Sequence, residues 1–106
     1  MPTLDDFKQF DFKVAQIESV EPHPNADKLL ILKLRVGDVE KQIVAGIRLH
    51  YTPEELVGKK IVIINNLEPA VIRGVESQGM LLAASDETSL SLVTPERAVS
   101  SGARVK

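Results

Sequence analysis

Histidines and paired carboxylates are the side chains of this sequence whose types could support catalysis or metal binding. His23 and His50 lie on separate segments with no further histidine at helical spacing, so the pattern predicts no metal site. Asp5-Asp6 and Glu54-Glu55 fall in the first turns of expected helices, where carboxylates stabilise the helix dipole. The sequence contains no glycine-rich phosphate loop and no nucleophile motif. It therefore predicts a binding protein without cofactor or metal, and not an enzyme.

Cationic and amide side chains offer the other chemistry, which is contact with phosphate and hydrogen bonding to RNA. The net charge is −2, from 13 basic and 15 acidic side chains. A domain that binds nucleic acid through its overall charge is usually basic. Any nucleic-acid site in this chain must therefore be a local patch.

The composition indicates one strand-rich domain. The 106 residues suffice for a single core, and 43% of them are apolar while only 4% are aromatic. The absence of cysteine excludes disulfides and favours a reducing, cytoplasmic location. The start at Met1 shows no signal peptide and fits a separate polypeptide or an expressed domain. The longest apolar run, 61–64, is far too short to span a membrane.

Apolar alternation and turn residues predict the strands that would position a binding site. The segment 30–36 alternates clearly, and Gly37-Asp38 turns the chain into the next strand. The apolar phase changes within 12–20, as in a bulged strand. The expected strands are 12–20, 30–36, 41–45, 61–65 and 79–84, followed by a further short strand at 89–93.

Two short helices are expected between and before these strands. Thr3 is the N-cap of a helix over 3–9, and Thr52 begins a second helix with Glu55 completing a capping box. Three strands, a helix and two strands is the order of an OB-fold, a five-stranded Greek-key β-barrel. We expect one domain over 1–106, with the barrel at 12–84 and extensions at 4–11 and 85–106. The pattern alone also fits a sandwich or an SH3-like barrel.

Four stretches occur in a fixed order along the chain. They are His23-Pro24-Asn25-Ala26-Asp27-Lys28-Leu29, Gln42-Ile43-Val44-Ala45-Gly46-Ile47, the segment 51–60, and Gly74-Val75-Glu76-Ser77-Gln78-Gly79-Met80-Leu81-Leu82-Ala83-Ala84. In order and spacing they resemble the tRNA-binding domain appended to many methionyl-tRNA synthetases. The same domain occurs as a separate subunit and in stand-alone tRNA-binding proteins. The resemblance runs from about residue 4 to the end and implies the OB-fold.

The resemblance also implies a function. A member of this family binds tRNA by its shape and phosphates and raises its local concentration, in association with a methionyl-tRNA synthetase. It further implies a cytoplasmic homodimer. The alternative is an OB-fold module that binds protein, such as a chaperone, because the net charge of this chain is negative.

Four candidate tRNA-binding residues lie in the first two thirds of the chain. Lys28 follows the first motif, and Lys33 lies on the polar side of the strand 30–36, on the face where OB-folds bind oligonucleotides. Asn25 and Asn66 carry amides that can bond a 2′-hydroxyl or a base edge, and the resemblance points to both. Solvated strand lysines and turn-forming asparagines are the structural alternatives.

The remaining candidates are Arg73, Ser77, Gln78 and Met80. Arg73 can bind phosphate through two N–H groups, and Ser77 and Gln78 can hydrogen-bond RNA. Met80 offers a soft apolar surface to an unstacked base, or else it belongs to the core. The structural alternative for Ser77 is a cap on a tight turn between Gly74 and Gly79.

Two further features qualify this interpretation. Many relatives have basic residues where this chain has Glu68, Ala70 and Val71, and each lost phosphate contact weakens salt-dependent binding. In addition, apolar side chains near the start, such as Phe7 and Phe10, and the tail 98–105 lie outside the predicted five-strand core. These segments either pack on their own barrel or form a two-fold interface.

Overall fold

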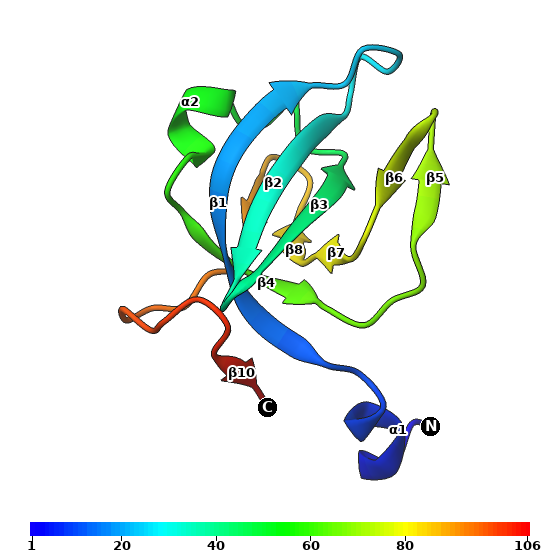
Figure 1. Ribbon diagram of the computed structural model, residues 1–106, viewed down its shortest axis with the longest axis vertical. Coiled ribbons are helices and arrows are strands. Elements are labelled where there is room, and N and C mark those ends of the chain that lie inside the picture. Colours follow the sequence, from blue (N-terminus) through cyan, green and yellow to red (C-terminus); the bar gives the residue numbers. More distant parts are fainter.

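The computed structural model describes residues 1–106, and its main body is a curled antiparallel sheet (Figure 1). The barrel strands are β1 (Phe12–Pro22), β2 (Leu30–Val36), β3 (Val39–Ala45), β4 (Lys60–Ile64) and β7 (Met80–Leu81). They lie in the order β3-β2-β1-β4-β7, and helix α2 (Pro53–Leu56) connects β3 to β4. This order confirms the predicted OB-fold.

Strand β1 pairs with two neighbouring strands and bends between the two paired regions. Its first half pairs with β4, from Phe12 to Gln16, and its second half pairs with β2. The register with β2 shifts between Ile17 and Ser19, which marks a β-bulge. A bulge bends a strand and increases its twist, so β1 can curl around the barrel. The phase change in the sequence correctly predicted this irregularity.

The core lies inside the curled sheet. Strand β2 contributes Leu30, Leu32 and Leu34, each fully buried, while Lys33 between them is exposed. Leu56 of α2 is also fully buried and covers one end of the barrel. The alternation in the sequence thus places one side of β2 in the core and leaves Lys33 outside.

Both predicted N-caps, Thr3 and Thr52, are confirmed, and a capping box forms at α1 (Leu4–Lys8) as well as at α2, where it was predicted. In α1 the Thr3 hydroxyl accepts a hydrogen bond from the Asp6 N–H, and Thr52 and Glu55 make the same exchange at α2. The Thr52 backbone N–H bond lowers the pKa of the Glu55 carboxyl. No helix in the structure has the length and apolar character needed to cross a membrane.

The segment after β4 differs from the sequence prediction in two places. Residues 70–77, which lie outside the strands predicted from the sequence, form a hairpin of β5 (Ala70–Ile72) and β6 (Val75–Ser77). The single strand expected at 79–84 is divided into β7 and β8 (Ala83–Ser85), and β8 pairs with β9 (Leu90–Leu92). The division arises at Leu82, whose N–H bonds Val62 of β4 while its carbonyl accepts from Val93 after β9. The chain therefore changes partner within one residue.

The C-terminal tail packs on its own barrel. Strand β10 (Arg104–Val105) pairs with the start of β1. The Ser101 hydroxyl donates to the Arg35 carbonyl at 2.6 Å and accepts from the Gly37 N–H at 3.0 Å. The tail thus follows the first of the two alternatives that the sequence left open.

Candidate nucleic-acid interface

The β5–β6 hairpin ends in a two-residue turn that carries Arg73 at its tip. Ile72 pairs with Val75, and the two residues between them have positive φ, 54° at Arg73 and 90° at Gly74. Two consecutive positive φ angles define a type I′ turn, which favours Asn-Gly. A left-handed backbone costs a non-glycine residue about 1–2 kcal/mol. Arg73 is exposed at the tip of the hairpin. Its left-handed backbone conformation is unfavourable for any residue other than glycine, asparagine or aspartate.

Side-chain oxygens attach this hairpin to the free edge of β3. The buried Ser77 hydroxyl accepts from the Val44 N–H at 3.0 Å and donates to the Gly79 carbonyl at 3.1 Å. The Gln78 Oε1 accepts from the Gln42 N–H at 2.9 Å, and the Gln78 N–H donates to the Gln42 carbonyl at 2.8 Å. Ser77 and Gln78 thus satisfy edge groups that a neighbouring strand would otherwise bond.

A buried histidine joins the β1–β2 loop, residues 23–29, to the same hairpin. The His23 Nε2 lies 3.0 Å from the carbonyl oxygen of Ile72, and its Nδ1 lies 3.0 Å from the Asn25 backbone nitrogen. The backbone N–H of His23 also donates a hydrogen bond to the Leu29 carbonyl, which closes the loop. Segments about 50 residues apart are therefore held together at one end of the barrel, seen at the top of Figure 1.

We define the end surface as Asn25, Lys28, Arg48 and Arg73, contributed by these two segments and the chain after β3. The Arg48 N–H donates to the Lys28 carbonyl at 3.4 Å, which brings Arg48 beside the β1–β2 loop. None of the three cations takes part in an ion pair within the chain. Their charge is therefore free to meet an anion. Sequence reasoning missed Arg48, because its segment shows no strand or turn pattern.

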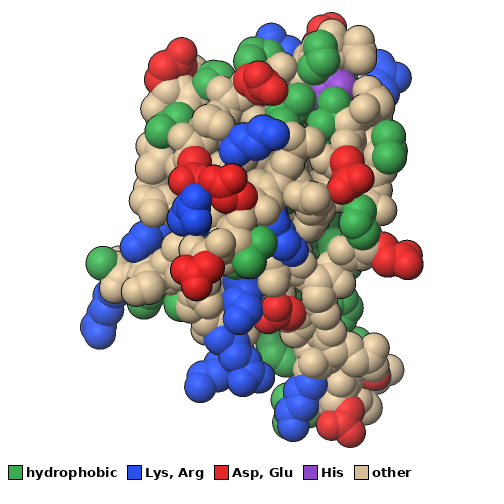
Figure 2. All heavy atoms as spheres, viewed as in Figure 1, with side chains coloured by type: hydrophobic (Ala, Val, Ile, Leu, Met, Phe, Trp, Pro, Cys, Tyr) green, Lys and Arg blue, Asp and Glu red, His purple; other side chains and the backbone are tan.

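The strand face beside the end surface carries charges that largely neutralise each other. Figure 2 shows basic and acidic side chains interleaved over these strands. Arg35 pairs with Glu18 at 3.2 Å and with Glu40 at 2.8 Å, and the bond to Glu18 raises the Arg35 pKa. Lys33 is exposed and hydrogen-bonds the Gln42 side chain. Of these two cations, Lys33 is therefore available to contact a phosphate, whereas Arg35 is already paired with two carboxylates.

Met80 does not belong to the core, because 47% of it is exposed. It lines a mostly apolar groove between the hairpin and the barrel. The other residues of the groove are Val44, Leu67, Glu68, Ala70, Ile72, Ser77 and Gly79. Such a groove can hold the face of an unstacked base or an apolar side chain.

Asn66 lies apart from the other candidates. Its Oδ1 accepts from the Asp11 N–H at 2.9 Å, and its Nδ2 donates to the Gln9 carbonyl at 2.9 Å. These bonds fix the segment between α1 and β1, at the bottom of Figure 1 and opposite the end surface. The structure therefore gives the Asn66 amide an anchoring role and does not bring it together with Asn25, Lys28 or Arg73.

Comparison with known proteins identifies the family of this chain. Residues 12–104 match the family described as "Putative tRNA binding domain". The methionine–tRNA ligase of Thermococcus kodakarensis is 49% identical over 104 residues, which is 98% of this chain but 14% of the ligase. The methionine–tRNA ligase of Methanococcus aeolicus is 52% identical over 102 residues, 96% of this chain and 15% of that ligase. This chain thus spans only a small part of these enzymes.

By contrast, this chain covers nearly the whole length of two solved structures. The MetRS-related protein of Pyrococcus horikoshii superposes with a TM-score of 0.93 at 38% identity, over 100% of this chain and 98% of the other. The CsaA chaperone protein of Picrophilus torridus superposes equally well, with a TM-score of 0.93 at 30% identity and full coverage of both chains. On these grounds, the chain belongs to the family of tRNA-binding domains and is a non-catalytic domain related to part of methionine–tRNA ligases.

Proposed function

We propose that this chain binds tRNA at the end surface and the adjoining strand face, for a methionine–tRNA ligase of the cytoplasm. The observation that supports this most strongly is that Lys28, Arg48 and Arg73, none of them in an ion pair, lie on segments held together at one end of the barrel. Unpaired cations release counterions from nucleic acid on contact, which drives binding even when the net charge of the protein is negative. By holding tRNA near a catalytic site, such a domain raises its effective concentration there.

Each proposed contact has a separate role. Lys28, Lys33, Arg48 and Arg73 contact phosphates, which position the tRNA without reading its sequence. The exposed Asn25 bonds a 2′-hydroxyl, and the groove beside Met80 receives an unstacked base. Ser77 and Gln78 act chiefly by holding the hairpin in place, because their oxygens already bond β3.

The function is tested by fluorescence anisotropy of labelled bulk tRNA at low and near-physiological salt, with a simple RNA hairpin as competitor. We expect the protein to prefer intact tRNA and to lose affinity steeply as salt rises. Absence of binding at low salt would refute the proposal. Salt-insensitive binding of unfolded polypeptide would instead support a chaperone, the alternative suggested by the CsaA likeness and the apolar groove.

The phosphate contacts are tested by the double variant Lys28→Ala/Arg48→Ala. We expect the slope of log K against log[salt] to fall by about 1–2, because each lost phosphate contact removes about 0.9. The matched control is Lys59→Ala/Arg97→Ala, which makes the same charge change at exposed positions outside the end surface. Equal effects of the two double variants would show that only net charge matters.

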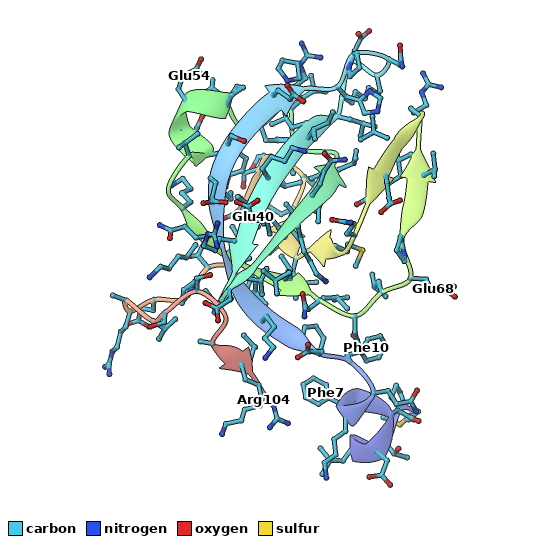
Figure 3. All side chains as sticks on the ribbon, in the orientation of Figure 1. Phe7, Phe10, Glu40, Glu54, Glu68 and Arg104 are labelled. Carbon is cyan, nitrogen blue, oxygen red and sulfur yellow. The ribbon has the colours of Figure 1, made fainter.

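A homodimer is the second part of the proposal, and its interface includes an aromatic cluster at the N-terminus. Phe12 stacks on Phe7 with ring centroids 5.4 Å apart and contacts Phe10 at 5.9 Å. Phe7, which lies in α1, and Phe10, which follows it, nevertheless remain 42% and 47% exposed (Figure 3). Exposed adjacent aromatic rings are characteristic of protein interfaces.

The dimer is tested by sedimentation of the double variant Phe7→Ser/Phe10→Ser. We expect the wild-type protein to sediment as a dimer and the variant as a folded monomer, because the interface loses its apolar centre. The control is Val57→Ser, which removes an equally exposed apolar side chain next to α2. A monomeric wild-type protein would disprove the dimer without affecting tRNA binding by the single chain.

A further inference from the structure

His23 is the one buried titratable side chain at the candidate interface. Only 3% of it is exposed, and it does not face the proposed ligand. Its ring lies between the β1–β2 loop, which carries Asn25 and Lys28, and the end of β5, which precedes Arg73. One imidazole thus contacts two of the three segments that build the end surface.

The two hydrogen bonds of the ring require a particular form of histidine. The Asn25 backbone N–H can only donate, so the His23 Nδ1 must be the unprotonated acceptor. The Ile72 carbonyl can only accept, so the Nε2 must carry the proton. The neutral imidazole with its proton on Nε2 satisfies both partners. A protonated ring would place an N–H donor against the Asn25 N–H.

We propose that neutral His23 is a positioning residue for tRNA binding, which fixes Asn25 and Arg73 relative to each other through its two ring nitrogens. The inference rests on the proposed function, since it concerns how the end surface is assembled. Loss of either ring hydrogen bond releases one of the two segments from the imidazole.

Two substitutions separate the two ring nitrogens. In His23→Gln the amide nitrogen takes the place of Nε2 and can still donate to the Ile72 carbonyl, but the bond to the Asn25 N–H is lost. In His23→Asn the amide oxygen takes the place of Nδ1 and can accept from the Asn25 N–H, while the link to β5 is lost. His50→Gln is the matched control, because His50 is the only other histidine and is exposed.

The experiment measures tRNA affinity at low salt and neutral pH, with circular dichroism to verify folding of each variant. We expect His50→Gln to bind like wild type and His23→Gln to bind more weakly, because it loses the bond to the loop. His23→Asn should bind about three- to tenfold more weakly than wild type. Full affinity of folded His23→Asn would overturn the proposal.

A measurement without tRNA distinguishes this proposal from the proposed function. Nitrogen-15 NMR of the free protein identifies the His23 tautomer, and amide exchange reports the attachment of residues 70–77. We expect the proton on Nε2, and faster exchange of the hairpin in His23→Asn than in wild type. A proton on Nδ1 would refute the positioning role. If the NMR results hold but tRNA does not bind at neutral pH, the link stands and the proposed function fails.

Discussion

Replacing Arg73 with asparagine should stabilise the protein and weaken tRNA binding at the same time. The backbone at Arg73 has φ of 54°, in the first position of a type I′ turn that is completed by Gly74. Asparagine tolerates this left-handed conformation, and Asn-Gly is the preferred pair for such a turn. We expect a gain of about 0.5–1 kcal/mol in the free energy of unfolding, which raises Tm by a few degrees.

The loss of the guanidinium has the opposite effect on binding. A bidentate phosphate contact at the hairpin tip contributes on the order of 1–2 kcal/mol, so tRNA affinity should fall about tenfold at low salt. Arg73→Lys is the control, since it keeps the charge and the backbone strain but not the planar fork, and its affinity should be intermediate. Thermal unfolding and anisotropy measure the two effects separately. A lower Tm for Arg73→Asn would contradict the strain, and unchanged affinity would remove Arg73 from the site.

The second large effect is expected for Ser77→Ala. Loss of the hydroxyl leaves the buried Val44 N–H without its acceptor and the Gly79 carbonyl without its donor. An unsatisfied buried group costs about 1–3 kcal/mol, which lowers Tm by about 4–8 °C per kcal/mol in a domain of this size. Faster amide exchange at Val44 would locate the effect. Binding should weaken as well, because the hairpin that carries Arg73 loses its attachment to β3.

The control for this variant is Ser85→Ala, in β8. Ser85 is exposed and makes no side-chain hydrogen bond, so we expect a change within about 0.5 kcal/mol. Weaker tRNA binding of Ser77→Ala with full stability and slow exchange at Val44 would show that the hydroxyl contacts tRNA directly. Full stability together with full affinity would contradict both roles.

Local patterns predicted most of the barrel. The alternation in β2, the phase change in β1, the Thr3 N-cap and the Thr52 capping box depend on interactions within a few residues, and each is present in the structure. The order of these elements fitted an OB-fold, a sandwich or an SH3-like barrel, and the family resemblance favoured the OB-fold among them. The β5–β6 hairpin was missed because Arg73-Gly74 is not a usual type I′ pair, and because the hairpin is held by Ser77, Gln78 and His23, whose partners are distant in sequence.

The residues of the candidate site also fall into two groups, those that local sequence could identify and those whose role depends on contacts between distant segments. Lys28 and Arg73 could be recognised from residue type and motif, since a cation next to a turn is exposed in almost any fold. By contrast, the pairing of Arg35 with Glu18 and Glu40, the exposure of Met80 and the anchoring of Asn66 depend on which residues the folded chain brings within a few ångströms. The same holds for Arg48 and for the ring of His23. Residue type and spacing specify local conformation and chemistry, whereas the availability of a side chain for a ligand depends on contacts between distant segments.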